Sequence, residues 1–174
     1  STQGYSSAAS DVYKRQGQCR IKRRTINKNN INIDIIGGRM ETNNENKNIL
    51  SEPELRFREE LKNCVKRIVD AADAKRANDI VAVHVGDKTI ITDWFVFMSG
   101  TSPIHVKALS DEIEDCAAEM GLPMRRREGY SEGRWIVLDF AGILVHIFHP
   151  EEREYYNVER LWMDATTEII RPEK

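Results

Sequence analysis

The chain has 174 residues, of which 40% are hydrophobic and 31% charged, and its formal net charge is −2. This length and composition fit one soluble domain with a single core. We expect neither a membrane-spanning segment nor a secretory signal, because no apolar run approaches the ~20 residues that a bilayer requires and none lies near the N-terminus.

The three cysteines, Cys19, Cys64 and Cys116, are few and lack C-x-x-C spacing. This argues against a disulfide framework and against a zinc site. We interpret Cys64 and Cys116 as small apolar side chains on helices.

Charge is distributed unevenly along the chain. Residues 1–39 hold eight basic and two acidic residues, a net charge of +6, which leaves −8 for residues 40–174. An acidic domain is repelled by phosphate backbones and attracted to basic surfaces. We therefore expect no membrane partner and no direct nucleic-acid recognition.

Residues 1–50 are rich in Ser, Asn, Lys and Arg, and we predict that they form a disordered or non-native extension. Three interpretations remain open: a basic tail, an organellar transit peptide, or a non-native stretch that ends before Met40, the true start. We favour the last, because Gly37-Gly38-Arg39 is what a ribosome-loading site would spell if translated in frame. The expected location is then the cytoplasm, or an organelle if the stretch is a transit peptide.

The folded part of the chain is predicted to begin with a helix at Ser51. Ser51 has capping-box spacing to Glu54, and Pro53 fits the first helical turn. The helix, which ends before Asn78, carries one apolar stripe: Leu61, Val65, Ile68 and Ala72. The β-branched run at residues 80–85 predicts a strand, and residues 89–99 predict a second one after a turn at residues 86–88.

The second half begins with a helix that Ser102 caps, with Pro103 in its first turn and Gly121 as its C-cap. Its apolar stripe is Val106, Leu109, Ile113, Cys116 and Met120. Next come a strand at residues 124–128, a loop at 129–133, and a hairpin of strands 135–139 and 143–148. A short helix from Glu151 to about Trp162 precedes a C-terminal tail, residues 165–174.

The predicted order is α-β-β-α-β-β-β-α. Strands alternate with helices and one hairpin is present, so the fold class is α/β, a mixed β-sheet with helices packed on it. The domain is expected to cover residues 51–164.

The four histidines do not form a metal-binding motif. His84 and His146 lie within apolar strands, His105 begins a helix, and His146 and His149 have a three-residue offset that points strand side chains to opposite faces. No H-E-x-x-H spacing occurs. We expect structural roles and no metal site.

Gly100-Thr101-Ser102, directly before a helix, could cradle a phosphate. A nucleotidyltransferase would add paired carboxylates on the following strand to hold magnesium. That strand reads Met124-Arg125-Arg126-Arg127-Glu128 and has no D-x-D. We therefore interpret the Gly-Thr-Ser turn as a capped helix start and the arginines as a solvated edge strand.

Eight motifs occur in one order, and together they resemble the ribosomal silencing factor family, also called the Iojap or RsfS family. They span about residues 55–164: Asn78-Asp79-Ile80, Thr92-Asp93-Trp94-Phe95, Gly100-Thr101-Ser102, His105-Val106, Gly133-x-Trp135, Leu138-Asp139-Phe140, Val145-His146-Ile147-Phe148 and Tyr156-x-x-Glu159-Arg160-Leu161-Trp162. Two departures stand out. Ala141-Gly142 replaces the family's usual Gly-Asp, and Trp94 replaces a smaller aromatic residue.

The resemblance implies a nucleotidyltransferase-like core without catalytic carboxylates, no enzymatic activity and no cofactor. It also implies binding to the large ribosomal subunit through ribosomal protein uL-fourteen. A protein on that face blocks joining of the small subunit and lowers translation under nutrient limitation. The alternatives are a large-subunit assembly factor or a nucleotidyltransferase-like nucleotide binder, and a homodimer is left open.

We predict that the late hairpin and the segment after it form the partner-binding surface. Tryptophan is enriched in interface hot spots but is often core in a small domain, and for Trp135 we leave both open while expecting partial exposure beside Gly133. The candidates are Trp135, Asp139, Glu151, Arg153 and Tyr156, with Asp79, Thr92 and Asp93 as further candidates that could instead cap turns.

Overall fold

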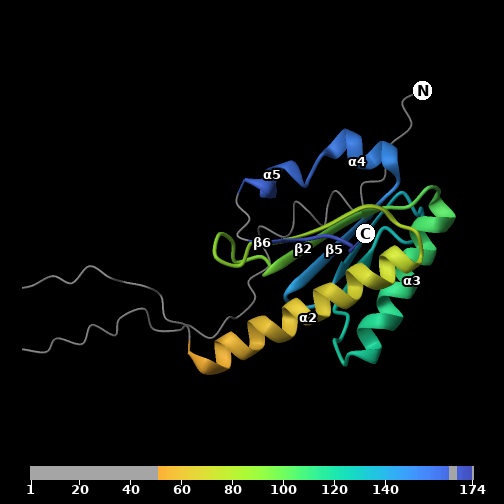
Figure 1. The fold of residues 1–174 in the computed structure, drawn as a ribbon. Helices are drawn as coiled ribbons and strands as arrows, with labels where there is room; N and C mark the ends of the chain where they lie inside the picture. Colours follow the sequence, from red (N-terminus) through yellow and green to blue (C-terminus); the bar gives the residue numbers. More distant parts are fainter. Residues whose placement is uncertain (1–50, 165–167, 174) are drawn as a thin grey trace, which may run out of the picture.

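The computed structural model describes residues 51–164 and 168–173, so the predictions for residues 1–50 lie outside the described part of the chain. The described residues form a six-stranded mixed sheet with helices on both faces (Figure 1). The strand order is β3-β4-β5-β2-β1-β6. This confirms the α/β class predicted from the sequence.

Helix α2, Glu52–Ala74, begins where its cap predicts. The Glu54 carboxylate accepts hydrogen bonds from the Ser51 backbone N–H at 2.9 Å and from the Ser51 hydroxyl at 2.7 Å. The first bond satisfies a backbone N–H that has no intrahelical partner, and both bonds fix the start of the helix. The predicted apolar stripe of α2 is buried.

Strands β1, Asn78–His84, and β2, Trp94–Ser99, are antiparallel. The second strand is shorter than predicted, because residues 89–93 belong to the connection. Backbone N–H groups of Lys88 and Thr89 both bond to the Val85 carbonyl, and the Ile91 N–H bonds to the Thr89 hydroxyl. These local bonds hold the segment in turns and away from the strand ladder.

Helix α3, Pro103–Glu119, has the predicted caps: the Ser102 hydroxyl accepts from the His105 N–H at 3.2 Å, and Gly121 has a positive φ of 69°. Strand β3, Arg126–Glu128, is an edge strand, as predicted. Strands β4, Trp135–Asp139, and β5, Ile143–Phe148, form the predicted hairpin. Parallel pairing of β5 with β2 makes the sheet mixed.

The C-terminal part differs from the prediction in two ways. Instead of one short helix, α4 spans Pro150–Tyr156 and α5 spans Arg160–Met163, because Asn157 adopts a left-handed conformation with φ 43° and ends α4. In the segment predicted as a tail, Glu168–Ile170 form the edge strand β6, antiparallel to β1. A three-residue strand is too short to show an alternating pattern.

Alternating side chains divide the core between the two faces of the sheet. Helices α2 and α3 cover one face, where Trp94, Val96 and Ile147 lie in a large buried cluster. Helices α4 and α5 cover the other, over Phe95, Phe97 and neighbouring aromatic residues (Figure 1). None of the described helices has the length and apolar character needed to cross a membrane.

Candidate functional site

The face under α4 and α5 is an aromatic layer built by three adjacent strands. Trp135 of β4 stacks on Phe148 of β5, with ring centroids 5.0 Å apart. Tyr156 of α4 lies 5.0 Å from Trp135, and Trp162 of α5 lies 4.8 Å from Phe95 of β2. Such ring pairs add to the stability that burial provides, so they fix α4 and α5 on the sheet.

His146 lies at the centre of this layer and is neutral. Complete burial lowers its pKa from 6.5 to about 3, because the charged imidazolium would lose its hydration. The neutral ring accepts a hydrogen bond at Nδ1 from Trp135 Nε1, at 3.2 Å. His146 therefore has the structural role that the sequence predicted.

Arg153 of α4 joins three elements. Its guanidinium donates to the Ser99 hydroxyl at 3.0 Å, to the Asp79 carbonyl at 2.8 Å, and to the Glu159 carboxylate at 2.6 Å. Only 13% of its side chain is exposed. These contacts attach α4 to the ends of β1 and β2 that lie beside it.

The outer surface of α4 and α5 combines exposed apolar residues with acids. Tyr155 is 81% exposed and Leu161 is 61% exposed. Glu151 and Glu154 are exposed on the same short helix as Tyr155. We call Tyr155, Leu161, Glu151 and Glu154 the α4–α5 patch. An exposed apolar surface surrounded by polar residues is typical of protein–protein contacts.

The residues predicted for partner binding fall at two ends of the sheet. Glu151, Arg153, Tyr156 and Asp79 lie at the end beside α4, with Trp135 beneath them. Trp135 is only 3% exposed, so the expected partial exposure was wrong: Tyr156, Phe148 and His146 enclose its ring. Tyr156 is itself half-buried over Trp135, whereas Glu151 is exposed and pairs with Arg134 at 2.7 Å.

The other three predicted residues lie at the opposite end of the sheet. Asp93 and Thr92 line a groove of about 390 Å³ together with Asp139. The Asp139 carboxylate accepts from the Ala141 N–H at 2.9 Å, which supports the tight turn where Ala141 has φ 65°. Thr92 is buried and donates to the Trp94 carbonyl. The candidate residues therefore do not form one continuous surface.

The Gly100-Thr101-Ser102 turn has the geometry of a capped helix start. The Thr101 N–H donates to His105 Nδ1 at 3.0 Å, and the His105 N–H donates to the Ser102 hydroxyl. The Gly100 N–H donates to the Phe148 carbonyl at 2.9 Å. A phosphate cradle needs N–H groups that point at the ligand, and these are engaged within the chain.

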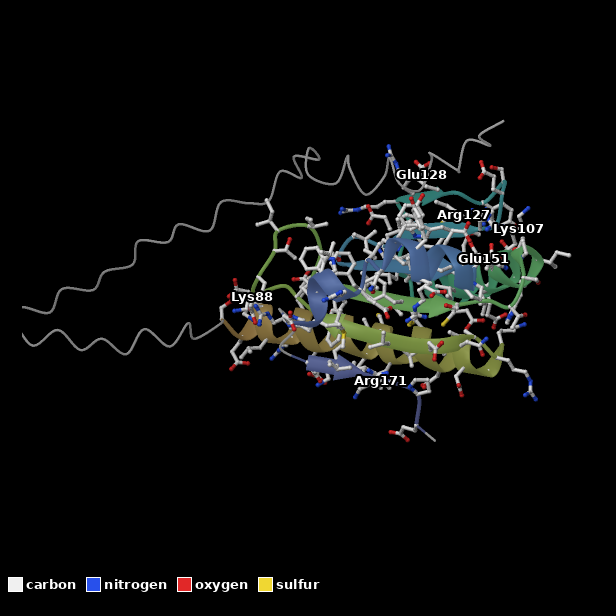
Figure 2. All side chains as sticks on the ribbon, turned by 90° about the horizontal axis from the view of Figure 1, so that it is seen from above. Lys88, Lys107, Arg127, Glu128, Glu151 and Arg171 are labelled. Carbon is white, nitrogen blue, oxygen red and sulfur yellow. The ribbon has the colours of Figure 1, made fainter. Side chains whose placement is uncertain are left out.

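The basic residues labelled in Figure 2 lie at several places on the described domain. Lys88 lies at one end, Lys107 and Arg127 at the other, and Arg171 near the C-terminus (Figure 2). Arg127 pairs with Asp111 at 3.1 Å and Glu114 at 2.8 Å, and it lies 4.1 Å from the ring centroid of Tyr130. The Arg127 charge is thus paired within the described domain.

Arg134 and Tyr155 were not among the residues singled out from the sequence, Leu161 appeared there only within a family motif, and His149 was expected to be structural. Two adjacent tyrosines on a short helix could have indicated that one of them faces outward, since i and i+1 positions lie on different faces. The environments of Arg134 and His149 depend on the contact between α4 and the start of β4, which sequence spacing does not reveal. Within residues 51–164 and 168–173, His149, Glu151 and Glu152 are the group whose atoms could meet at a metal ion.

The fold and this surface define a layered α/β protein with an aromatic core beneath two short C-terminal helices. Residues 58–174 match the profile of a family described as "Ribosomal silencing factor during starvation". This match covers more than half of the chain, so the chain belongs to the ribosomal silencing factor family, as the eight motifs had indicated.

Individual relatives agree with this assignment. Ribosomal silencing factor RsfS of Bacillus subtilis is 40% identical over 104 residues, which cover 60% of this chain and 88% of the relative. The mouse protein named "Mitochondrial assembly of ribosomal large subunit protein 1" is 30% identical over 101 residues, covering 56% of this chain and 44% of that protein. A crystal structure of a Bacillus halodurans protein superposes with a TM-score of 0.53 at 36% identity, covering 58% of this chain and 94% of that one.

Proposed function

We propose that the protein binds the large ribosomal subunit through ribosomal protein uL-fourteen and prevents the small subunit from joining. Translation would then fall when nutrients are limiting. The observation that carries this proposal is the family match over residues 58–174. We further propose that the protein acts without catalysing a reaction, since steric exclusion requires only a bound, folded domain.

The described domain is suited to such a role. Helices pack on both faces of its sheet over two buried hydrophobic clusters, so the folded domain can occupy a docking surface. A standard stable interface buries about 1,600 Å² in total, which a domain of this size can supply. No closing loop or substrate is needed for exclusion.

Charge supports a protein contact on the ribosome. Residues 40–174 carry a net charge of −8. A basic ribosomal protein would attract this domain over a long range, whereas ribosomal RNA would repel it. The proposed encounter should therefore slow as salt concentration rises.

We propose the α4–α5 patch as the principal contact surface. Tyr155 and Leu161 supply apolar side chains that lie outside the core, and Glu151 and Glu154 can pair with lysine or arginine on the partner. Binding energy usually concentrates in a few large side chains at the centre of a contact. Tyr155 is the best candidate for such an anchor, because it is large and highly exposed.

The main test is subunit joining. Purified small and large subunits are mixed with saturating protein, and the products are separated on a sucrose gradient. We expect free subunits to accumulate and joined ribosomes to fall, with the protein comigrating with the large subunit. Joined ribosomes at the normal level, despite saturating protein, would contradict the proposal.

A second prediction tests the contact surface. Tyr155→Ala should weaken large-subunit binding by about 2 kcal/mol or more, roughly 30-fold, if Tyr155 is a buried anchor in the complex. Binding is measured by cosedimentation over a range of protein concentrations. Because Tyr155 is exposed in the free domain, thermal unfolding should change little.

Ile90→Ala is the matched control for Tyr155→Ala. Ile90 is 78% exposed, similar to Tyr155, but it lies in the β1–β2 connection at the other end of the sheet. We expect Ile90→Ala to bind the large subunit as the unmodified protein does. Equal weakening by both substitutions would show that the α4–α5 patch is not the specific contact.

The second candidate function is assembly of the large subunit, which the name of the mouse relative suggests. An assembly role predicts that depletion of the protein causes precursor large subunits to accumulate. A purely silencing role predicts mature subunits in normal amounts and excess translation during starvation. Targeting of a full-chain fluorescent fusion to mitochondria or plastids would favour an organellar form of the assembly role.

A further inference from the structure

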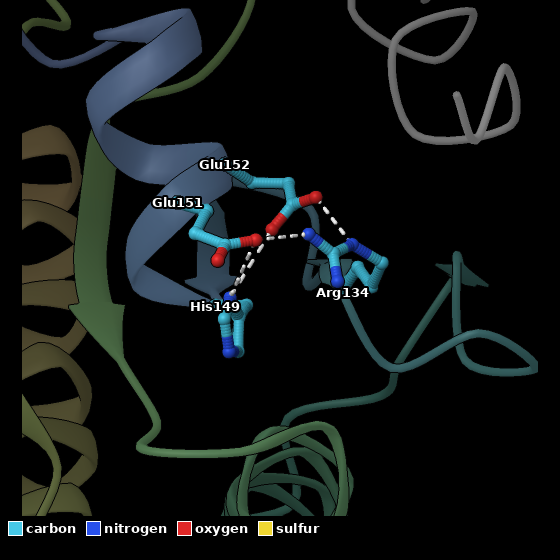
Figure 3. Close-up of polar contacts among 4 residues, drawn as sticks. All are labelled: Arg134, His149, Glu151 and Glu152. Carbon is cyan, nitrogen blue, oxygen red and sulfur yellow. Dashed lines mark hydrogen bonds and ion pairs between the residues drawn. The ribbon is translucent and has the colours of Figure 1, made fainter. Parts of the chain in front are cut away.

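A polar cluster joins the residue before β4 to the first turn of α4. It contains Arg134, His149, Glu151 and Glu152 (Figure 3). The His149 N–H donates to the Arg134 carbonyl at 2.7 Å, so the backbone places the two segments side by side. This contact sets the positions from which the four side chains meet.

Two atoms of this cluster are buried without a hydrogen bond to any described residue: Nδ1 of His149 and Oε2 of Glu152. Glu152 as a residue is only 9% exposed. The two atoms face each other at 3.4 Å, and Glu151 Oε2 lies 3.9 Å from His149 Nδ1. A buried carboxylate oxygen without a bonded partner carries a large free-energy cost, which a bound cation would offset.

The distances fit a small tetrahedral ion. Two ligand atoms that each lie about 2.1 Å from a tetrahedral zinc ion are separated by roughly 3.4 Å. His149 Nδ1 and Glu152 Oε2 already have that separation. Candidate ligand atoms of all three residues lie within 4.8 Å of one another. The Glu151 side chain is 73% exposed, so it has the freedom to move the remaining fraction of an ångström.

Arg134 also contacts both carboxylates. Its Nε donates to Oε1 of Glu152, and its Nη2 donates to Glu151 at 2.7 Å. Two carboxylates against one guanidinium leave the cluster with one net negative charge when His149 is neutral, so a divalent ion is attracted to it.

We propose that His149, Glu151 and Glu152 form a binding site for a divalent transition-metal ion, with zinc as the best match to the ligand set. Imidazole nitrogen with carboxylate oxygen is a donor set that zinc accepts, and three protein ligands leave a fourth position for water or for a group on a partner. Arg134 is the positioning residue that holds the ligating carboxylates through hydrogen bonds.

The competing explanation is an ion pair without metal, in which a protonated His149 donates to Glu152. The test is zinc binding to the full chain, purified without a histidine tag and stripped with a chelator, by titration calorimetry. Cobalt absorption then reports the coordination geometry. We expect one ion per chain with micromolar or tighter affinity, and a cobalt spectrum typical of nitrogen and oxygen ligands.

Single substitutions assign the site. His149→Gln, Glu152→Gln and the exposed Glu151→Gln should each weaken zinc binding at least tenfold. Glu154→Gln is the matched control, since it removes an exposed acid from the same helix, and it should bind zinc normally. Circular dichroism shows whether the substitutions at the largely buried side chains of His149 and Glu152 disturb folding. If they do, Glu151→Gln still tests the site, because Glu151 is exposed. Absence of stoichiometric binding, or equal binding by Glu151→Gln and unmodified protein, would overturn the proposal.

Discussion

Replacement of Trp135 with alanine is expected to lower the free energy of unfolding by about 4 kcal/mol. The side chain is almost fully buried; it stacks on Phe148 and packs at a tilt against Tyr156, each 5.0 Å away between ring centroids. Its loss leaves a cavity under α4 and removes the donor to His146 Nδ1. Urea denaturation followed by far-ultraviolet circular dichroism measures the change.

Trp135→Phe separates packing from hydrogen bonding. It keeps an aromatic ring under Tyr156 but removes the indole N–H, so it should cost about 1–2 kcal/mol through the unpaired, buried His146 nitrogen. If the Trp135→Ala protein were nearly as stable as the unmodified one but failed to bind the large subunit, Trp135 would be a partner-binding residue, one of the two roles that the sequence left open.

The elements that could be predicted are those whose signals are local. Ser51 with Glu54 begins α2, Ser102 with Pro103 begins α3, and Gly121 follows its end, because capping depends on residues within one turn. The β4–β5 hairpin was likewise predicted from two apolar runs and a short connection. These features need no knowledge of the tertiary structure.

The elements that were missed depend on distant contacts. Strand β6 exists because the backbone of residues 168–170 pairs with β1, more than 80 positions earlier. The connection before Trp94 contains β-branched residues that suit a strand, but local bonds to Val85 hold it in turns. Asn157 divides the last helix through a left-handed backbone that its sequence context does not specify.

The candidate site shows the same division. Glu151 and Tyr156 could be assigned to one surface because they share a helix. The burial of Trp135, the cluster around Glu152 and the contacts of Arg153 arise only when α4 packs on the sheet. From the sequence, the histidines could only be examined for spacings that would place two ligands on one strand or helix. In the structure, His149 instead lies beside Glu152 at the start of a helix, next to Arg134.

Substitution of Arg153 by alanine is expected to destabilise the domain by about 3 kcal/mol. Four side-chain hydrogen bonds to three partners are lost at once: one to the Ser99 hydroxyl, one to the Asp79 carbonyl and two to the Glu159 carboxylate. The Glu159 side chain is then left with a charge that lacks its partner. Because 29% of that side chain is exposed, water screens part of the penalty, and the estimate lies at the lower end of the range for buried pairs.

Two further substitutions of arginine distinguish a structural role from a partner contact. Arg160→Ala removes an exposed arginine from the adjacent helix α5 and should change the free energy of unfolding by less than about 0.5 kcal/mol. Arg153→Lys keeps the positive charge, but a lysine ammonium lacks the planar, forked guanidinium that reaches all three partners. This variant should therefore recover only part of the lost stability. Chemical denaturation is measured beside large-subunit binding for each variant. If Arg153→Ala were fully stable and bound the subunit poorly, Arg153 would act at the ribosomal contact, because a structural role must appear in the unfolding free energy.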